Sequence, residues 1–329
     1  MSLKLMFAYQ EWPYRQTFEF ARETREFAPL FLVQISDGSH IGRGECGLQS
    51  LKNETRDGVA AQLREIKDRI SAITSHEELN RVMPVCSARN GVDAAFWDLE
   101  CKRAATSIWE LTGIQRPAKI EVDITIGINP TQKMCADARA AISKGYRLLK
   151  IKSDAKDILD RIGAISSVTP GARFIVDANE AWSMEQLSTL APRLKSLNVV
   201  LIEQPLHHER DAKLMDYDCP VPLCADESCA TRDGLSRLAE RYDAISIKLD
   251  KSGGLTEALS LAREARGLGM GLMMGCNGAT SLGNAPAYVV GSLCDWRDID
   301  SQELLFEDRA GGMVTRNGEL FAFDGALWG

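Results

Sequence analysis

Long apolar runs, a signal-peptide start and an excess of basic residues are all missing from this 329-residue sequence. None of its apolar segments approaches the ~20 residues that a membrane-spanning helix needs. The start, MSLKLMFAYQEWPY, has no apolar h-region. The net charge of −7 argues against nucleic acid or an anionic membrane as the main partner. By elimination, we expect a cytoplasmic protein.

Paired cysteine motifs are also absent. The nine cysteines are an odd number and are scattered along the chain, which does not indicate a disulfide framework but suits a reducing compartment. The nearest approach to a motif is Cys224 and Cys229, whose four-residue separation is not a zinc spacing. We interpret the cysteines as small buried hydrophobic residues.

Strand-like runs precede helical patterns in residues 1–115. The runs LKLMFAYQEW, APLFLVQISDG and HIGRGECGL include a turn signal, SDGSH. RDGVAAQLREIKDRISAI and SARNGVDAAFWDLECKRAA then repeat apolar residues at intervals of three and four. This order predicts a small α+β domain. The last segment, 311–329, predicts a hairpin turning at RNG that packs back on this domain.

The rest of the chain, 116–310, repeats one pattern eight times. Each short apolar run ends in polar residues and precedes an amphipathic stretch, at steps of about 22 to 27 residues, as a strand–helix unit requires. A closed (β/α)8 barrel is favoured. The alternative, an open doubly wound sheet, would want a glycine-rich turn after its first strand, and TIGINPT is not one. The runs are 122–127, 148–152, 173–179, 199–205, 221–227, 243–250, 271–276 and 296–300.

Charged residues gather at the carboxyl ends of these predicted strands. In such a barrel the ends meet at one mouth, where active sites lie. One strand-end acid often caps a helix, and one lysine is often solvated. Five successive strands that end in lysine or an acid indicate a function, because each charge is partly desolvated. The residues at the strand ends are Lys150, Lys152, Asp177, Asn179, Glu203, Asp226, Glu227, Lys248, Asp250, Asp298 and Asp300.

Three of these carboxylates, Asp177, Glu203 and Asp226, lie on consecutive predicted strands. Mg²⁺ takes oxygen ligands and keeps open positions for water or substrate. No cysteine or histidine occupies these positions, which disfavours zinc and copper. The sequence predicts one Mg²⁺ per subunit, with Mn²⁺ as a substitute.

Lysines on the second and sixth predicted strands would face each other across the mouth. A carboxylate substrate held by Mg²⁺ can lose its α-proton because the metal stabilises the resulting enediolate. A lysine near a cation and a second lysine should have a lowered pKa, which makes a neutral amine base accessible near pH 7. With one lysine on each face, a proton can leave one side and return to the other. The predicted reaction therefore inverts a stereocentre.

The ordered motifs LLKIK, IVDANEAW, LIEQP, CADES and IKLDKSGG resemble those of the muconate-lactonizing subgroup of the enolase superfamily. The resemblance covers essentially the whole chain, including GRGECG and ARNGVDAAFWDLECKRA. It implies a modified barrel beneath an N-terminal capping domain, and often a homo-oligomer. The mandelate racemase branch is disfavoured, because MMGCNGA offers no histidine at the seventh strand end. The four histidines, which lie outside the strand ends, are His40, His76, His207 and His208.

The resemblance assigns roles by position. Lys152 and Lys248 would be the two acid/base lysines, and the three carboxylates named above would hold Mg²⁺. Lys150 would help to hold the substrate carboxylate. Asp250 and Lys251 would support the site or the structure.

Asp298 and Asp300 flank one isoleucine in DWRDIDSQELL, so both point to one face of a strand. Two neighbouring carboxylates repel unless a cation lies between them. Three other strands already supply the metal ligands, and Arg297 should point to the opposite face. The pair resembles that of the dipeptide epimerases, which implies a substrate ammonium as its partner.

The segment FEFARETREF of the first domain offers Arg22 and Arg25 as a flexible loop. These resemble the loop arginine that meets the glutamate carboxylate in L-Ala-D/L-Glu epimerases, although a solvated loop charge is an equal alternative. Asn277 and Ala279 in GCNGATS depart from that group, so they put the preference for Ala-Glu in question while Asn277 stays a candidate for substrate binding.

The resemblance implies an Mg²⁺-dependent dipeptide epimerase, acting on L-Ala-D/L-Glu peptides from peptidoglycan recycling and inverting the C-terminal residue's α-carbon. Other reactions of the subgroup stay open: a cycloisomerase, an o-succinylbenzoate synthase or an N-acylamino acid racemase. The third hypothesis is a non-catalytic binding protein, but such a protein would not need both lysines and all three carboxylates that are predicted to hold the metal.

Overall fold

The computed structural model describes residues 2–19, 24–49 and 52–329. The nine cysteines are free thiols and seven are buried, which confirms that they pack as small side chains. No helix in the described ranges is both long and apolar enough to cross a membrane.

The first domain is an antiparallel three-stranded sheet, in the order β1-β2-β3, packed against helices. Its strand-first, helix-later order is the one that the sequence predicts. The SDGSH turn is also present, since Asp37 N–H donates to His40 O between β2 and β3. The elements are β1 (Lys4–Glu19), β2 (Thr24–Ser36), β3 (Ile41–Cys46), α1 (Arg56–Arg69), η2 (Ile70–Ala72), α2 (His76–Val82), α3 (Ser87–Ala104) and α4 (Ile108–Thr112).

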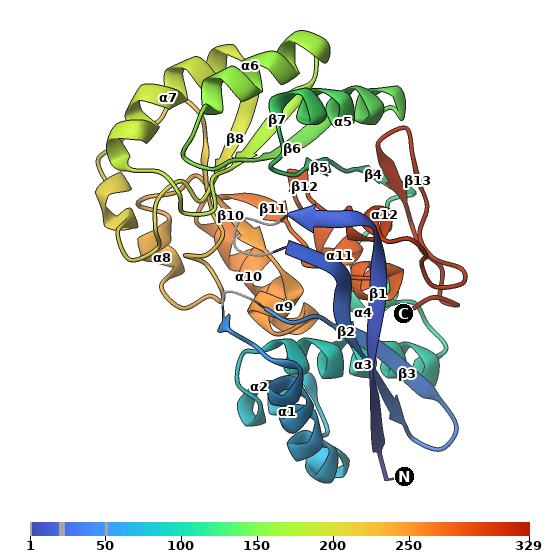
Figure 1. The fold of residues 1–329 in the computed structure, drawn as a ribbon. Coiled ribbons are helices and arrows are strands. Elements are labelled where there is room, and N and C mark those ends of the chain that lie inside the picture. Colours follow the sequence, from blue (N-terminus) through green and yellow to red (C-terminus); the bar gives the residue numbers. More distant parts are fainter. Residues whose placement is uncertain (1, 20–23, 50–51) are drawn as a thin grey trace.

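The hairpin of β1 and β2 is longer than the sequence pattern suggests. It extends beside the barrel toward β10 and β11 (Figure 1), and Phe306 N–H donates to Pro13 O at 2.7 Å. Arg25 lies on β2, opposite Phe18, so the expectation of a loop at Arg25 is wrong. Arg22 lies outside the described residues. Backbone pairing, which a charged sequence does not reveal, extends the strands here.

Eight parallel strands form the second unit, in the order β5 to β12. Asp123 N–H donates to Arg297 O at 2.9 Å, which joins the two edges of the curved sheet. The barrel and its N-terminal cap are therefore confirmed. The strands are β5 (Ile124–Ile126), β6 (Leu148–Lys152), β7 (Arg173–Asp177), β8 (Val199–Glu203), β9 (Leu223–Ala225), β10 (Ala244–Ile247), β11 (Gly271–Met274) and β12 (Trp296–Arg297).

The connecting helices differ from a uniform repeat. After β8 and β9 the structure has only η3 and the four-residue α8, so a long helix after every strand is a wrong expectation. The segment before β9 contains Pro220 and Pro222, which break helical hydrogen bonding. The helices are α5 (Thr131–Ser143), α6 (Ile158–Val168), α7 (Met184–Ser196), η3 (Asp211–Leu214), α8 (Leu235–Leu238), α9 (Leu249–Ser252), α10 (Leu255–Gly267), α11 (Ser281–Gly291) and α12 (Ser301–Leu304).

The barrel interior changes from apolar to charged along the strands. Alternate strand residues share a face, so β6 turns Leu148, Lys150 and Lys152 inward. An apolar layer fills the interior below the charges, which therefore face the carboxyl end of the barrel. This layer consists of Leu148, Ile175, Leu201, Cys224, Ala244 and Met273.

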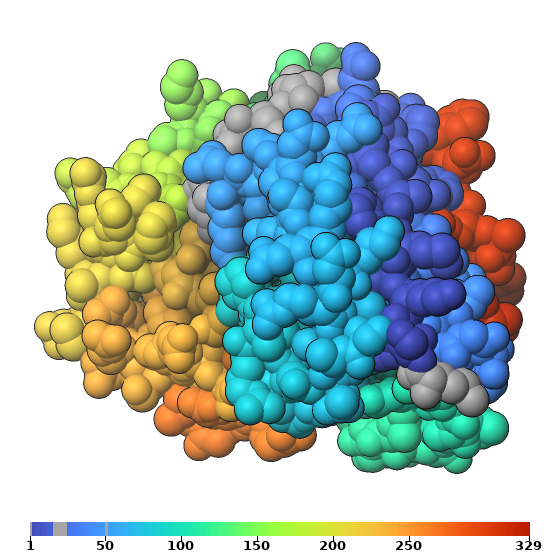
Figure 2. Space-filling model, turned by 90° about the horizontal axis from the view of Figure 1, so that it is seen from below, coloured from blue at the N-terminus to red at the C-terminus, as the bar shows by residue number. Residues whose placement is uncertain are grey.

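The C-terminal segment forms a hairpin, β13 (Thr315–Arg316) and β14 (Glu319–Phe321), which pairs with β4 (Lys119–Glu121). Asn317 and Gly318 both have positive φ at the turn, which suits a tight hairpin. Beyond it, Trp328 Nε1 donates to Ala94 O of α3 at 3.0 Å. Figure 2 shows the first domain, blue to cyan, covering one face of the molecule beside barrel segments coloured green to orange.

Asp93 of α3 fixes the first domain against the barrel. It contacts His76 Nδ1 at 2.8 Å and accepts hydrogen bonds from the backbone and hydroxyl of Thr256 on α10. A Cβ at Gly254 would lie 2.5 Å from Asp93 Oδ2, so only glycine permits this approach. Burial opposes the charged His76 imidazolium, but Asp93 and Glu100 outweigh it and raise the pKa to about 9.

This histidine predicts a pH-dependent stability. Because the pKa of His76 is higher in the folded state than in the unfolded state, protonation of His76 stabilises the fold. This stabilisation is fully present below pH 6.5, the unfolded-state pKa, and should disappear as the pH rises through about 9. The loss of unfolding free energy caused by His76→Gln should be roughly 3 kcal/mol larger at pH 6 than at pH 9.5. Urea unfolding of both proteins across this range measures the difference. A difference independent of pH would contradict the charged His76; His40→Gln, at an exposed turn, is the control.

Candidate active site

Two lysines flank three carboxylates across five neighbouring strands at the mouth of the barrel. Lys152 Nζ lies 2.6 Å from Asp177 Oδ2 at one end of the row. Lys248 Nζ lies 2.6 Å from Asp226 Oδ2 at the other end. Glu203 of β8 lies on the strand midway between them. The two lysines therefore approach the centre of the mouth from opposite sides.

Lys150 lies deeper in the same row and is 1% exposed. Its Nζ is 2.7 Å from Glu203 Oε2 and 3.1 Å from Asp177 Oδ2. It is also 2.7 Å from Asp298 Oδ2, across the seam where the barrel closes. Lys150 thus connects the row of carboxylates to the acidic pair on the last strand.

The residues predicted to hold Mg²⁺ fit a hard cation by donor type and burial. Asp177 and Glu203 are fully buried and Asp226 is 4% exposed. Glu203 Oε1 has no hydrogen-bond partner among the described residues. Burial and then Asp177 raise the pKa of Glu203 to about 7, so positive charge beside it would favour the carboxylate. Lysine Nζ atoms lie against each acid, and the three sets of oxygens do not all come within 4.8 Å of one another.

Local hydrogen bonds hold the carboxylate-bearing strand ends in place. Gln204 has a positive φ of 37°, and its side-chain oxygen accepts from Asp226 N–H at 2.9 Å. Lys251 Nζ donates to Asp226 Oδ1 and to Ser246 O. These contacts support the interpretation of Lys251 as a residue that positions a carboxylate.

The expected lowering of the lysine pKa depends on a bound cation; among the protein groups alone, the pKa of two lysines is raised. Burial disfavours the charged form of Lys248, but Asp226 and Glu203 outweigh burial and raise its pKa. The pKa of Lys150 is raised in the same way, by Asp298 and Glu203 against burial. The sequence places lysine beside lysine, but folding places each one directly against a carboxylate.

A cluster of three acids lies at the barrel seam, and the strand-end pattern of the sequence does not include one of them. Asp123 is fully buried, and burial followed by the charges of Asp298 and Asp300 raises its pKa. Neither Asp123 oxygen has a hydrogen-bond partner among the described residues. Burial and Asp298 also raise the pKa of Asp300 to about 7. The signal for Asp123 in the sequence is an acid inside the predicted strand VDITIG.

Asp298 and Asp300 already have internal partners. Lys150 holds Asp298, and Thr125 N–H donates to Asp300 Oδ2 at 2.7 Å. The expectation that no internal cation remains for this pair is therefore wrong, because Lys150 reaches across the seam. Arg297 does point away, because it donates to backbone carbonyls of Gly291 and Cys294. Of the three seam acids, Asp298 is the one that forms a direct ion pair with Lys150, so the mutual repulsion of the three is only partly relieved.

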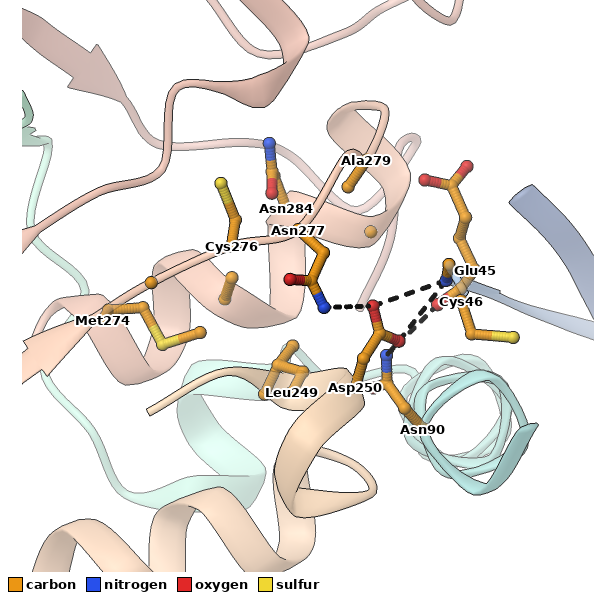
Figure 3. A pocket seen from close by; sticks show the side chains of 14 residues that line it. Glu45, Cys46, Asn90, Leu249, Asp250, Met274, Cys276, Asn277, Ala279 and Asn284 are labelled. Atoms are coloured by element: carbon orange, nitrogen blue, oxygen red, sulfur yellow. Dashed lines mark hydrogen bonds between the residues drawn. The ribbon is translucent and has the colours of Figure 1, made fainter. Parts of the chain in front are cut away.

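A small pocket lies between the first domain and the barrel and is lined by residues of both (Figure 3). Asp250 Oδ1 accepts from Asn90 Nδ2 at 2.7 Å, and Asn277 Nδ2 lies 3.5 Å from Asp250 Oδ2. Burial raises the pKa of Asp250 to about 6, against the hydrogen bond from Asn90. Asn277 therefore lies at the edge of the site, oriented toward Asp250, and Ala279 lines the same pocket.

The remaining predicted residues lie farther from the centre or link to it. Asn179 Oδ1 accepts from Lys152 Nζ at 3.2 Å, and its amide lies 3.5 Å from Glu227. Burial and then Asp226 raise the pKa of Glu227 to about 8. Arg25 is partly exposed on the hairpin.

Two parts of the chain, one in the cap and one in the barrel, match described protein families. Residues 3–113 match the family "Mandelate racemase / muconate lactonizing enzyme, N-terminal domain". Residues 133–319 match "Enolase C-terminal domain-like". Both matches agree with the cap and barrel seen in the structure, so the chain belongs to the enolase superfamily, in the sequence group that includes mandelate racemase and the muconate lactonizing enzymes.

Two relatives narrow the class. The L-Ala-D/L-Glu epimerase of Escherichia coli is 37% identical over 94% of this chain and 97% of its own length. The N-acetyl-D-glutamate racemase of Pseudoalteromonas is 40% identical over 77% of this chain and 79% of its own. These relatives are an epimerase and a racemase, which confirms the predicted isomerase class.

Solved structures of similar fold also include dipeptide epimerases. An enolase family member from Agrobacterium tumefaciens with homology to dipeptide epimerases, solved with sodium and L-Ala-L-Glu, has a TM-score of 0.95 at 38% identity. That match covers 99% of this chain and 100% of the other. A dipeptide epimerase of Methylococcus capsulatus, complexed with Mg and L-Arg-D-Lys, has a TM-score of 0.91 at 25% identity, covering 98% of each chain.

Proposed function

We propose that this chain is an Mg²⁺-dependent dipeptide epimerase that inverts the α-carbon of the C-terminal residue, with L-Ala-D/L-Glu as its substrate. The observation that carries the proposal is the row of charges with Lys152 and Lys248 at its opposite ends. The relatives that act on such dipeptides support the substrate class. We further propose that the enzyme recycles cell-wall peptides in the cytoplasm.

Lys152 and Lys248 would exchange one proton with the substrate from opposite faces. The neutral lysine removes the α-proton, and the protonated lysine on the other face returns one, which inverts the carbon. Asp177, Glu203 and Asp226 would hold Mg²⁺, which when bound supplies positive charge to the deprotonated substrate carboxylate. Lys150, already between these acids and Asp298, would add a second positive charge at that carboxylate.

The acids at the barrel seam would bind the other end of the substrate. A dipeptide carries an ammonium at its other end, and Asp298 with Asp300 offers it a buried anionic site. Asp123 adds a third acid, so a substrate cation would reduce repulsion that Lys150 alone only partly relieves. Arg25, and Arg22 outside the described residues, are proposed to meet the glutamate side chain, and Asn277 beside Asp250 is proposed to contact the substrate.

Removal of the metal tests the proposed Mg²⁺ dependence. Chelation of divalent ions should abolish epimerisation, and Mg²⁺, or Mn²⁺ as a substitute, should restore it. Glu203→Gln should raise the Mg²⁺ concentration for half-maximal activity by at least about tenfold, because outer-sphere partners alone cost this much. Glu209→Gln, an exposed acid, should leave it unchanged. Full activity of the chelated enzyme would contradict the proposal.

A second candidate is an N-acylamino acid racemase, favoured by the 40% identity to the N-acetyl-D-glutamate racemase. Its substrate has no ammonium, and the pairing of Asp298 with Lys150 suits a site that needs no external cation. Parallel assays of L-Ala-L-Glu and N-acetyl-glutamate for α-proton exchange in D₂O separate the two. Exchange of the acylated substrate alone would favour the second candidate.

A further inference from the structure

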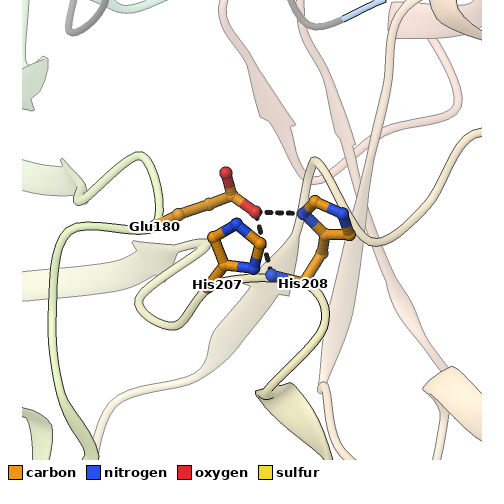
Figure 4. Close-up of side chains that lie close together, drawn as sticks. All are labelled: Glu180, His207 and His208. Atoms are coloured by element: carbon orange, nitrogen blue, oxygen red, sulfur yellow. Dashed lines mark hydrogen bonds and ion pairs between the residues drawn. The ribbon is translucent and has the colours of Figure 1, made fainter.

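Two histidines and one glutamate gather at the rim of the barrel mouth, outside the lysine–carboxylate row (Figure 4). Glu180 follows the end of β7 by three residues, and His207 and His208 follow the end of β8 by four and five. Neighbouring parallel strands place these loops together. The proposed acid/base chemistry uses none of the three.

Their ligand atoms already converge. His208 Nδ1 lies 2.5 Å from Glu180 Oε1, and the His208 backbone N–H donates to the same oxygen at 2.8 Å. The two imidazole rings stack, with centroids 4.5 Å apart and planes 23° apart. One ligand atom from each residue lies within 4.8 Å of the other two. A histidine–carboxylate hydrogen bond is an arrangement in which a metal ion can replace the shared proton.

The donor set selects the class of metal. Two histidines and a glutamate are a known zinc ligand set, with a fourth position for water, and zinc–ligand bonds of ~2.0–2.2 Å imply ligand atoms about 3.3 Å apart. The observed atoms therefore need only side-chain adjustments. Imidazole suits Zn²⁺, Cu²⁺ and Ni²⁺, whereas Mg²⁺ demands oxygen ligands. The rim and the carboxylate row thus prefer different ions.

Exposure makes the rim accessible. The side chains of His207 and His208 are 45% and 41% exposed, while Glu180 is 6% exposed. A buried acid anchors the cluster, and two exposed imidazoles can take up an ion from solution.

We propose that Glu180, His207 and His208 form a second metal site, which binds one divalent transition metal ion such as Zn²⁺ independently of Mg²⁺. The site lies one residue from Asn179, whose side chain accepts a hydrogen bond from Lys152. It also joins the loop after β7 to the loop after β8, which are already linked where the Trp182 backbone N–H donates to Pro205 O. A bound ion would therefore fix two active-site loops to each other.

Zn²⁺ titration of the enzyme in excess Mg²⁺ tests the site. Calorimetry should give one Zn²⁺ per chain, and His208→Asn should weaken binding at least about tenfold, as should His207→Asn. Zn²⁺ should also raise the unfolding temperature of the wild type, because only folding brings the three ligand residues together. The same shift should be absent from both variants, whose unfolding temperatures in chelator should equal that of the wild type.

Two controls distinguish this site from the others. His40→Asn removes an exposed imidazole from the first domain and should leave Zn²⁺ binding unchanged. Glu203→Gln alters the carboxylate row and should also leave it unchanged, so the proposal stands or falls separately from Mg²⁺ catalysis. Absence of Zn²⁺ binding to the wild type, or equal binding by His208→Asn, would overturn the proposal.

Discussion

Replacing Lys152 or Lys248 by alanine should reduce epimerisation by about a thousandfold or more in both directions. Each lysine is the sole proposed acid/base group on its face, and such groups contribute about 10²–10⁴-fold. Inversion needs both faces, so the loss of either lysine blocks both directions. Chiral chromatography of the two dipeptide epimers measures the loss.

Solvent exchange gives a sharper result. The lysine that remains in each variant can still remove the α-proton on its own side and return deuterium there. In D₂O, each variant should therefore exchange one epimer without inverting it, and the two variants should exchange opposite epimers. Lys144→Ala, on the surface at the end of α5, is the control and should match the wild type. Inversion at the wild-type rate by either variant would remove that lysine from the mechanism.

The positions behind this prediction follow from the sequence alone. Parallel strands have short apolar runs, and their ends meet at one mouth, so the pattern brings Lys152, Asp177, Glu203, Asp226 and Lys248 together. Their pairing does not follow from it. Alternation fixes the face of a side chain but not which neighbour it contacts, and the closest neighbour decides the direction of a pKa shift.

The seam shows the same limit. Asp123 and Asp298 are far apart in sequence and meet only because the barrel closes between β5 and β12. No period in the sequence encodes that closure, so the sequence indicates neither Asp123 as a member of the site nor Lys150 as the partner of Asp298. The length of the β1–β2 hairpin is hidden for a related reason: cross-strand pairing can extend strands through residues without apolar alternation.

The closure of the barrel leads to the second large effect. The double variant Asp298→Asn with Asp300→Asn should lower kcat/KM for L-Ala-L-Glu by roughly a thousandfold, because a desolvated charge pair at an interface is worth ~2–5 kcal/mol. Lys150 should keep its place, since Glu203 and Asp177 also hold it. The loss should fall mainly on dipeptides with a free ammonium.

Comparing substrates isolates the ammonium. The N-acetylated dipeptide lacks the positive charge, so the wild type should use it poorly, and the double variant should discriminate far less between the two forms. Asp295→Asn, whose acid pairs with Arg266 on the outer face, should preserve the wild-type preference. Equal loss on both substrates would mean that the acids serve only to hold Lys150. Unchanged activity on the free dipeptide would instead mean that the two aspartates do not bind the substrate. Their cation would then be Lys150, and their role would be in the folding of the barrel.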